Sequence, residues 1–264
     1  MKTITSLLLL SLSFSSAQET LPTADSDNQK QKEEFFTPKR DRKKTNRNGI
    51  FIEGRPNVLI IGDSISIGYT PTVITELEET ANIFRIPTNG GHTGKGIENI
   101  DKWLGDRRWD VIHFNWGLHD LCYRHPKSKT QGKRDKENGT QDMPIEQYQI
   151  NLKKLVMRLK ETNAKLIWAS TTLVPEEEAG RFVGDDFKYN EVARSIMEEQ
   201  GILINDLHSV STTITETFIR PGNVHFTSEG SKKLGKQVAE TIKSQLPRNE
   251  NDNFPNEQKK QNSP

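Results

Sequence analysis

The chain has 264 residues, which is enough for one sizeable domain or two small ones. Its 37 Lys and Arg residues nearly balance its 36 Asp and Glu residues, and the formal net charge of +1 gives no reason to expect nucleic acid as a partner. Cys122 is the only cysteine, so no intramolecular disulfide can form and the stability of the fold must come from a packed core.

The N-terminal residues have the features of an export signal. Lys2 precedes a short apolar run at residues 7–12, and the small residues 15–17 follow where a signal peptidase would cut. The apolar run is much shorter than the roughly 20 residues that span a bilayer, so we expect no stable membrane insertion. We therefore predict a cleavable signal peptide at residues 1–17 and a secreted or periplasmic protein; an uncleaved anchor is the alternative.

The polar composition of both ends sets off one folding segment. Residues 18–54 hold few apolar side chains and a run of basic ones, and residues 247–264 are similarly polar. Such composition is typical of solvated segments that cannot form a core. We predict a disordered linker at 18–54, a single domain at 55–246 and a disordered tail at 247–264. Binding of an acidic polymer is the alternative role for the basic run.

Within residues 55–246, apolar runs alternate with stretches of helical spacing. The alternation of strands with helices predicts a parallel sheet that is wrapped by helices. The expected strands lie at residues 57–62, 82–86, 110–117, 165–171 and 202–207, and the expected helical stretches run through 76–79 and cover 96–105, 144–163, 189–200 and 228–246.

The segments that follow these strands carry the candidate functional residues, because ligands bind beyond the carboxyl ends of the strands in such sheets. These segments bring together a hydroxyl at Ser64, a glycine-rich loop at residues 88–96, and the imidazoles of His119 and His225. A weak nucleophile, a base with a pKa near neutrality and N–H donors for an oxyanion are the components of nucleophilic catalysis.

Other motifs fit the sequence poorly. Ser66 stands where Gly-x-Ser-x-Gly requires its last glycine, which disfavours the α/β-hydrolase elbow. Asn89 and Gly96 replace the glycine and the hydroxyl residue that a phosphate loop needs. The evenly spaced histidines match no known zinc pattern, so we expect neither a metal nor a cofactor. These histidines are His113, His119 and His125.

Four blocks in chain order resemble the SGNH/GDSL hydrolase superfamily, which consists of secreted or periplasmic esterases and lipases. "GDSIS" (62–66) is similar to the first block, "NGGHTG" (89–94) to the second, "GLHD" (117–120) to the third and "NVHFTSEG" (223–230) to the fifth. The resemblance spans residues 57–246. It implies a flavodoxin-like three-layer α/β/α sandwich with a five-stranded parallel sheet, and a carboxylic ester hydrolase.

The resemblance also implies the roles of individual residues. Ser64 would be the nucleophile and His225 the base. The backbone N–H groups of Ser64 and Gly94, together with a ring nitrogen of His119, would form the oxyanion hole. An acyl-enzyme would form on Ser64 and be hydrolysed by water that His225 activates.

Two acidic residues of these blocks have a simpler expected role. Asp63 and Asp120 lie in the turns that follow two strands. Short acidic side chains in turns commonly accept hydrogen bonds from backbone N–H groups, so we expect both residues to fix the turns rather than to take part in the chemistry.

The sequence departs from the family pattern at the acid of the triad. The fifth block usually reads Asp-x-x-His, but Gly222 stands three residues before His225. The group that orients His225 could be a main-chain oxygen near residues 221–222, the side-chain oxygen of Asn223 or the carboxylate of Asp206. The missing acid is also the chief argument for an alternative, a noncatalytic carbohydrate-binding protein on a hydrolase scaffold.

A second departure concerns the third block, in which His119 stands where the family usually has Asn. A neutral imidazole offers one N–H donor and can replace an amide N–H geometrically. Because an imidazole titrates near neutrality, we expect the oxyanion hole to be sensitive to pH.

The substrate is predicted from the loops. A polar insertion at residues 122–143 and a long loop at 173–186 would cover the site and select the substrate. Their polarity favours a small, soluble acyl ester, first an O-acetyl group on a glycan and second a short-chain lipid or aryl ester. An acyltransferase would use the same residues. Neither nucleic acid nor a particular oligomeric state is indicated.

Overall fold

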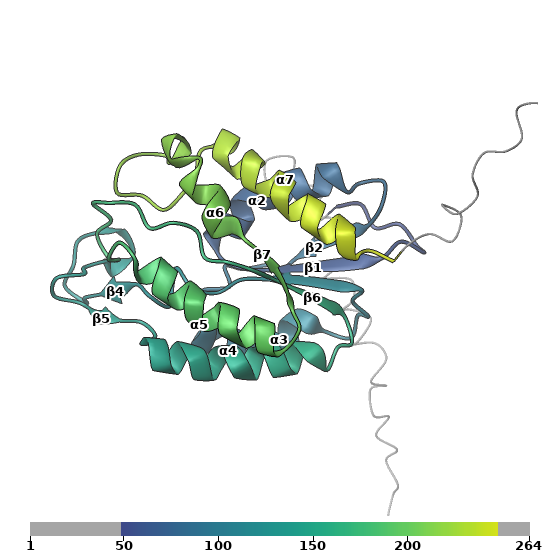
Figure 1. Ribbon diagram of the computed structural model, residues 1–264, viewed down its shortest axis with the longest axis horizontal. Helices are drawn as coiled ribbons and strands as arrows, with labels where there is room; N and C mark the ends of the chain where they lie inside the picture. Colours follow the sequence, from purple (N-terminus) through teal and green to yellow (C-terminus); the bar gives the residue numbers. More distant parts are fainter. Residues whose placement is uncertain (1–48, 248–264) are drawn as a thin grey trace, which may run out of the picture. The chain divides into compact units, whose positions relative to one another are not determined.

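The computed structural model describes residues 49–247, which form a three-layer α/β/α sandwich (Figure 1). Its central sheet is parallel, with the strand order β2-β1-β3-β6-β7. This is the flavodoxin-like order with five strands, so the predicted fold class is confirmed. The strands are β1 (Asn57–Ile61), β2 (Asn82–Arg85), β3 (Val111–Phe114), β6 (Lys165–Ala169) and β7 (Leu203–Asn205).

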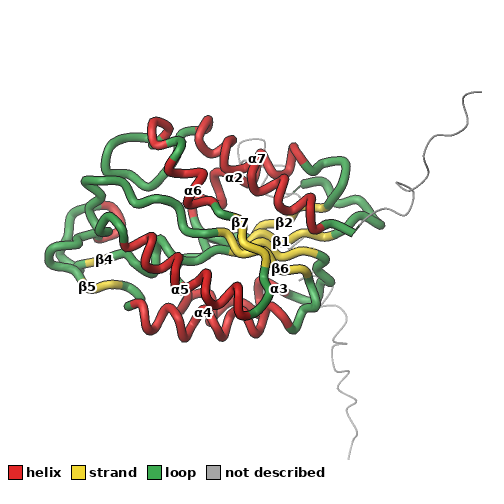
Figure 2. The backbone as a smooth tube through the Cα atoms, in the orientation of Figure 1, coloured by secondary structure: helices red, strands yellow, loops and turns green. Residues whose placement is uncertain are grey.

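Helices cover both faces of the sheet. Figure 2 shows the yellow strands between two layers of red helices, with α2, α6 and α7 in one layer and α3, α4 and α5 in the other. Neighbouring helices within each layer pack against each other. The helices are α2 (Ser64–Glu76), α3 (Thr93–Leu104), α4 (Ile145–Lys160), α5 (Asp185–Glu199), α6 (Leu207–Thr212) and α7 (Ser228–Gln245).

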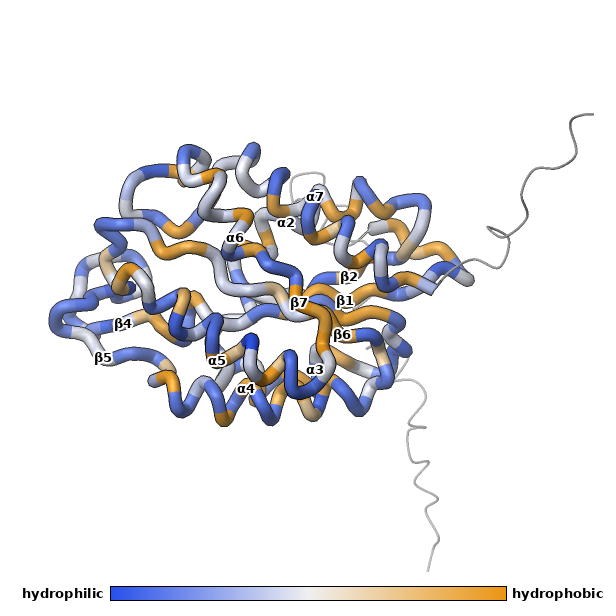
Figure 3. Tube along the Cα trace, in the orientation of Figure 1, coloured by the Kyte–Doolittle hydropathy of each residue, from blue (hydrophilic) through white to orange (hydrophobic). Residues whose placement is uncertain are grey.

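The core is centred on β1 and β3, because a strand that is covered on both faces must be apolar throughout. Residues 58–61 are buried in β1, and Val58 pairs with Ile83 on one side and Val111 on the other. Figure 3 shows the hydrophobic residues gathered along the strands, whereas the helices alternate between hydrophobic and hydrophilic positions. This is the pattern of helices that bury one face against the sheet.

The observed elements differ from the predicted ones mainly at their ends. Helix α3 begins at Thr93, earlier than predicted, because the His92 side chain caps it by accepting a hydrogen bond from Lys95 N. Strand β7 ends at Asn205, because Asp206 caps the short helix α6, which the sequence did not predict. The insertion at 122–143 also holds an unpredicted antiparallel ribbon, β4 (Tyr123–Arg124) and β5 (Thr140–Gln141).

The predicted signal peptide lies outside the described residues, as does nearly all of the predicted linker and tail. The last residues of the linker are described, and they are bound to strand β2: Gly49 N donates to Ile83 O (3.0 Å) and Ile52 N donates to Asn82 Oδ1 (2.7 Å). The contacts of the domain therefore begin before the predicted start at residue 55. Between residues 49 and 247, none of the helices combines the length and apolarity that a membrane crossing requires.

Helices α2 and α7 approach each other closely, and a glycine makes this approach achievable. A Cβ atom on Gly235 would lie 2.6 Å from the Thr72 side chain and 2.9 Å from the Tyr69 carbonyl oxygen. Real Cβ atoms are not found at such distances, so any larger residue would push the helices apart. Both helices begin at the edge of the sheet where the candidate residues lie.

We predict that Gly235→Ala destabilises the protein although alanine is the better helix former. Helix propensity alone favours alanine over glycine by about 1 kcal/mol. Overpacking against the α2 backbone costs about 1–3 kcal/mol, so the free energy of unfolding should fall. Urea unfolding measures this change.

The matched control is Gly68→Ala on helix α2. Its Cβ would meet only the Ser231 side chain, with Oγ at 2.9 Å, and that hydroxyl can rotate away. This variant should be as stable as the wild type or slightly more so. If Gly235→Ala were equally stable, the close contact would not constrain the pair of helices.

Candidate active site

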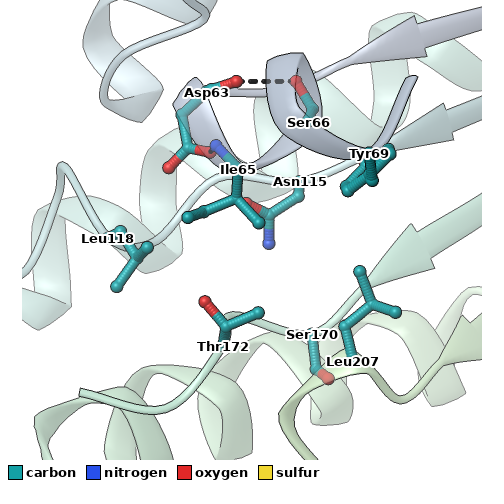
Figure 4. A pocket seen from close by; sticks show the side chains of 9 residues that line it. All are labelled: Asp63, Ile65, Ser66, Tyr69, Asn115, Leu118, Ser170, Thr172 and Leu207. Carbon is teal, nitrogen blue, oxygen red and sulfur yellow. Dashed lines mark hydrogen bonds between the residues drawn. The ribbon is translucent and has the colours of Figure 1, made fainter. Parts of the chain in front are cut away.

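Ser64 lies at the carboxyl end of β1, as the first residue of helix α2. The turn before it is fixed by Asp63, whose Oδ1 accepts a hydrogen bond from Ile65 N (2.9 Å) and caps the helix. Figure 4 shows the same turn from close by, with the Ser66 hydroxyl donating to the Asp63 carbonyl. Asp63 thus holds the turn, as predicted, and Ser64 is left partly exposed at the edge of the sheet.

A buried arginine that the sequence did not single out supports this turn from behind. Arg85, at the end of β2, donates from Nη2 to the carbonyl oxygens of Gly62 (3.0 Å) and Asp63 (3.1 Å). Its Nε donates to Ser66 Oγ (3.1 Å). Because the guanidinium binds three acceptors of one turn, it fixes the backbone that presents Ser64.

His225 reaches Ser64 from the loop before helix α7. The His225 Nε2 atom is 2.9 Å from Ser64 Oγ, although the two residues are 161 positions apart in the sequence. His225 Nδ1 is 2.8 Å from Asn223 Oδ1, and the same oxygen accepts a hydrogen bond from the His225 backbone N–H (2.9 Å). The three side chains therefore form a chain of contacts from hydroxyl to imidazole to amide.

The second contact of Asn223 settles which nitrogen of His225 carries the proton. A backbone N–H can only donate, so the Asn223 atom that faces it must be the carbonyl oxygen. That oxygen can only accept, so the neutral ring of His225 carries its proton on Nδ1. The lone pair on Nε2 is then directed at the Ser64 hydroxyl, which is the arrangement that a general base requires.

The structure also gives a physical reason for the missing triad acid. Gly222 has a φ of 65°, and a Cβ atom there would lie 2.6 Å from the Glu177 carbonyl oxygen. An aspartate at position 222 would be strained in its backbone and would clash with the neighbouring loop. The adjacent Asn223 occupies the place behind His225 instead.

Asp206, the other candidate for orienting His225, is engaged elsewhere. Its carboxylate accepts hydrogen bonds from Ser209 N (3.1 Å) and Ser170 Oγ (2.9 Å) and lies 3.7 Å from Arg194 Nη2. These contacts make Asp206 the cap of helix α6. Of the two side chains proposed from the sequence, Asn223 is the one in contact with the imidazole.

The surroundings of His225 favour the neutral ring. Burial lowers the pKa of His225 below its usual value of 6.5, while the charge of Asp63 raises the pKa and that of Arg181 lowers it further. No carboxylate is bonded to Nδ1 to counteract the burial, because Asn223 is uncharged. His225 therefore stays in the form that can accept a proton to a lower pH than a solvent-exposed histidine.

Hydrogen bonds join the glycine-rich loop to its neighbours on both sides. Gly90 N donates to the Gly62 carbonyl oxygen (2.9 Å), which ties the loop to the turn of Ser64. Thr93 donates to Asp120 Oδ1 from its backbone N (2.8 Å) and from its hydroxyl (2.6 Å). Asp120 therefore binds a backbone N–H as predicted, and it brings the segments of Gly94 and His119 together.

Gly94 is the second residue of helix α3. The N–H groups in the first turn of a helix have no acceptor within the helix, and they lie at its positive end. The backbone N–H of Gly94 is thus of the kind that binds an anion. The same holds for Ser64, which is the first residue of α2.

His119 lies partly buried between charged groups, and one expectation about it is wrong. Burial lowers the pKa of His119 to about 4, with an opposing effect of Asp63 and further lowering by Arg181 and Arg124. The ring therefore titrates well below neutrality, not near it as predicted, and it is neutral at ordinary pH. His119 Nδ1 is 3.4 Å from Arg124 Nη2.

The two loops around the site are locked together by a buried ionic cluster. Glu178 of the 173–186 loop is fully buried and binds Arg181 (3.0 Å) and, from the insertion, Arg134. Arg181 Nε also donates to the Leu118 carbonyl oxygen (2.7 Å), next to His119. Sequence analysis did not single out these charges, and only the fold reveals that Glu178 and Arg181 are buried.

A small pocket lies behind the turn of Ser64, and Figure 4 shows the side chains around it, among them Asp63, Tyr69 and Thr172. Ser64 and His225 do not line it, so this pocket is not where a substrate would meet them.

Within residues 49–247 no group of three or more His, Cys, Asp or Glu side chains is placed to hold a metal ion. Cys122 is buried.

Neither a protein-family model nor a curated protein matches the sequence, but solved structures match the fold. The acetyl xylan esterase AlAXEase has a TM-score of 0.58 at 14% identity and is matched over 70% of this chain and 99% of its own. A lipase/acylhydrolase from Enterococcus faecalis has a TM-score of 0.59 at 17% identity, over 73% and 97% of the two chains. A GDSL-like lipase from Parabacteroides merdae has 0.56 at 16%, over 74% and 99%.

These similarities establish the architecture. The chain has the fold of SGNH/GDSL hydrolases, so the resemblance seen in the four sequence blocks is confirmed at the level of the fold. At such low identity, the roles of the individual residues rest on the geometry described above.

We predict that Asn223→Asp raises the pKa of His225. A carboxylate in contact with the imidazolium stabilises the charged form, and such contacts shift a pKa by about 1–3 units. NMR titration of the His225 ring in both proteins measures the shift. The pKa of His225 should lie below 6.5 in the wild type and should be higher in Asn223→Asp than in the wild type.

Asn138→Asp is the matched control, since it adds the same charge to an exposed position in the insertion. It should leave the His225 pKa unchanged. An equal pKa in wild type and Asn223→Asp would mean that residue 223 does not contact the ring in solution.

Proposed function

We propose that the protein is a serine carboxylic ester hydrolase in which Ser64 is the nucleophile and His225 is the general base. The observation that carries this proposal is the 2.9 Å contact between His225 Nε2 and Ser64 Oγ, with the tautomer fixed by Asn223. The solved structures with this fold include enzymes named as ester hydrolases, which supports the same reaction class.

The proposed reaction begins when the Ser64 hydroxyl attacks the ester carbonyl and passes its proton to His225 Nε2. The oxyanion is held by the N–H groups of Ser64 and Gly94 and by the ring of His119, each donor contributing about 3 kcal/mol in the transition state. His225 then protonates the leaving alcohol, and an acyl-enzyme remains. Water then attacks the acyl-enzyme in the same way, with His225 again as the base, and the carboxylic acid is released.

An asparagine behind the histidine is compatible with this mechanism here, although it is harmful at the position of the triad aspartate in a serine protease. Replacing the triad aspartate by asparagine costs about 10⁴ in rate there, because the histidine takes the wrong tautomer. Here the backbone N–H of His225 keeps the amide oxygen toward Nδ1, so the tautomer is correct. What is lost is only the negative charge that would stabilise the imidazolium.

For the substrate, we propose an O-acetyl group on a glycan. An acetyl xylan esterase is among the structures with this fold. The 173–186 loop and the start of α5 also expose apolar side chains: Phe182 is 40% exposed, Val183 58% and Phe187 58%. A cluster of exposed apolar side chains often marks a binding site. A flat aromatic ring can stack on the apolar face of a sugar.

This cluster adjoins the candidate site through Arg181, the neighbour of Phe182, which binds the carbonyl of Leu118. The Phe182 ring is held edge-on by Tyr123, with ring centres 5.3 Å apart. Secretion or export to the periplasm, as predicted from residues 1–17, would place such an enzyme where glycans are found.

We predict that Ser64→Ala and His225→Ala each abolish the hydrolysis of short-chain acyl esters. Loss of either member of a serine–histidine pair costs several orders of magnitude in kcat, so a fall of at least about 10³ is expected. A fluorophosphonate probe should label the wild type and not Ser64→Ala. The rate of p-nitrophenyl acetate hydrolysis and the extent of labelling are the measurements.

Ser209→Ala and His125→Ala are the matched controls, because they remove the same chemical groups outside the site, and both should retain activity. A wild type that binds acetylated glycans without hydrolysing any ester, and that resists the probe, would favour the noncatalytic binding protein. Transfer of the acyl group to an added alcohol in preference to water would favour an acyltransferase.

We predict that Phe182→Ala selectively weakens the turnover of glycan esters. The value of kcat/KM for an acetylated xylo-oligosaccharide should fall about tenfold, which corresponds to ~1.4 kcal/mol of lost contact. For p-nitrophenyl acetate, which has no sugar to bind, it should stay unchanged. Met157→Ala, which trims an exposed side chain on α4, is the control. An equal loss on both esters would argue against a glycan subsite at Phe182.

A further inference from the structure

The replacement of the usual Asn by His119 creates a requirement that an amide does not have. A neutral imidazole carries one proton, on either Nδ1 or Nε2, and the partner of one nitrogen decides which nitrogen is left to donate. If His119 is to donate to an oxyanion in a defined direction, something must fix its tautomer. An asparagine N–H₂ group donates without such help.

Arg124 of strand β4 supplies this partner. Its Nη2 atom is 3.4 Å from His119 Nδ1. A guanidinium has five N–H donors and no acceptor, so Nδ1 must accept in this contact. The proton of the neutral ring then lies on Nε2, on the opposite side of the imidazole from Arg124.

The other two nitrogens of the guanidinium are bound within the insertion. Nε donates to Asp142 Oδ2 (2.5 Å), and Nη1 donates to the Gly132 carbonyl oxygen. All three corners of the planar group thus have acceptors, which leaves the side chain little freedom to turn away from His119.

The insertion is in turn anchored to the segment that bears His119. Asp142 N donates to the Cys122 carbonyl oxygen (2.9 Å), and Met143 N donates to the Asp120 carbonyl oxygen (2.9 Å). The ribbon therefore returns to the loop from which it departs. Arg124 and His119 are held by one continuous set of backbone contacts.

We propose that Arg124 is a positioning residue for the oxyanion hole, which it serves by holding His119 in the tautomer that carries the proton on Nε2. This inference rests on the proposed ester hydrolase function. It gives the insertion at 122–143 a second role besides covering the substrate, because the ribbon carries the group that makes a histidine act in place of the amide.

The charges favour this role as well. When an oxyanion forms, the neutral ring of His119 links it to the positive guanidinium, so the imidazole is polarised in the direction that strengthens the Nε2–H donor. Asp142 balances the charge of Arg124 through its contact with Nε. Protonation of Nδ1 would remove the acceptor that Arg124 binds, in keeping with a ring that stays neutral.

The first test reads the tautomer directly in the resting protein. Nitrogen-15 NMR of histidine-labelled wild type should show His119 with a protonated Nε2 and an unprotonated Nδ1 at neutral pH. In Arg124→Met, which keeps an unbranched apolar stem and removes the guanidinium donors, the two tautomers should become mixed. A wild-type His119 with its proton on Nδ1 would overturn the inference, whatever the activity of the enzyme.

The second test is a double-mutant cycle with His119→Asn. In the wild-type background, Arg124→Met should lower kcat about 10- to 100-fold and change KM less than about twofold, because a misdirected donor loses much of what a complete deletion loses. In the His119→Asn background, the same substitution should change kcat less than about twofold. A purely structural Arg124 would cost the same in both backgrounds, and that result would refute its positioning role.

Lys129→Met is the control for charge, since it removes an exposed positive charge from the same insertion, and its kcat should match the wild type. The role of Arg124 and the ester hydrolase function can be refuted independently. A wild type that hydrolyses esters but has the other tautomer refutes the role of Arg124 alone, whereas a wild type without hydrolytic activity refutes the function.

Discussion

The hydrogen bond between Ser64 and His225 depends on how closely helix α2 packs against helix α7. Ser64 opens α2, and His225 lies just before the start of α7, so the distance between the two side chains is set by the distance between the two helix beginnings. Gly235 allows the α7 backbone to rest on α2, while Asp63 and Arg85 fix the turn that leads into α2. The contact between Ser64 and His225 is therefore a product of core packing, and neither loop could place it alone.

The electrostatics of the site differ from those of a triad with a carboxylate. Asn223 orients the imidazole of His225 and supplies no charge, so the largest compensation by a neighbouring charge comes from Asp63, which raises the pKa of both His225 and His119. Asp63 is buried in the turn before Ser64, where it also caps α2. One carboxylate thus serves the turn directly and the two histidines through space, while burial keeps both rings neutral.

Much of this could be predicted from the sequence, because Ser64, Gly94, His119 and His225 each follow or precede an element that the apolar pattern reveals. The pattern could not choose between Asn223 and Asp206, since that choice depends on the positive φ of Gly222 and on the approach of Glu177. It also missed Arg85 and Arg124. Arginines that bind several acceptors within the fold look the same in a sequence as arginines on the surface, and only long-range contacts separate them.

The two loops around the site, residues 122–143 and 173–186, are bound to each other. The Glu177 backbone packs against Gly222, near His225, while Arg181 binds Leu118, beside His119. Between them, Glu178 joins the 173–186 loop to the insertion through Arg134. Removing Glu178 would leave the buried guanidinium of Arg181 without its carboxylate, which costs several kcal/mol. The loops that are proposed to select the substrate are therefore coupled to both sides of the candidate active site, and in the proposed enzyme a change in the loops would alter the chemistry together with the specificity.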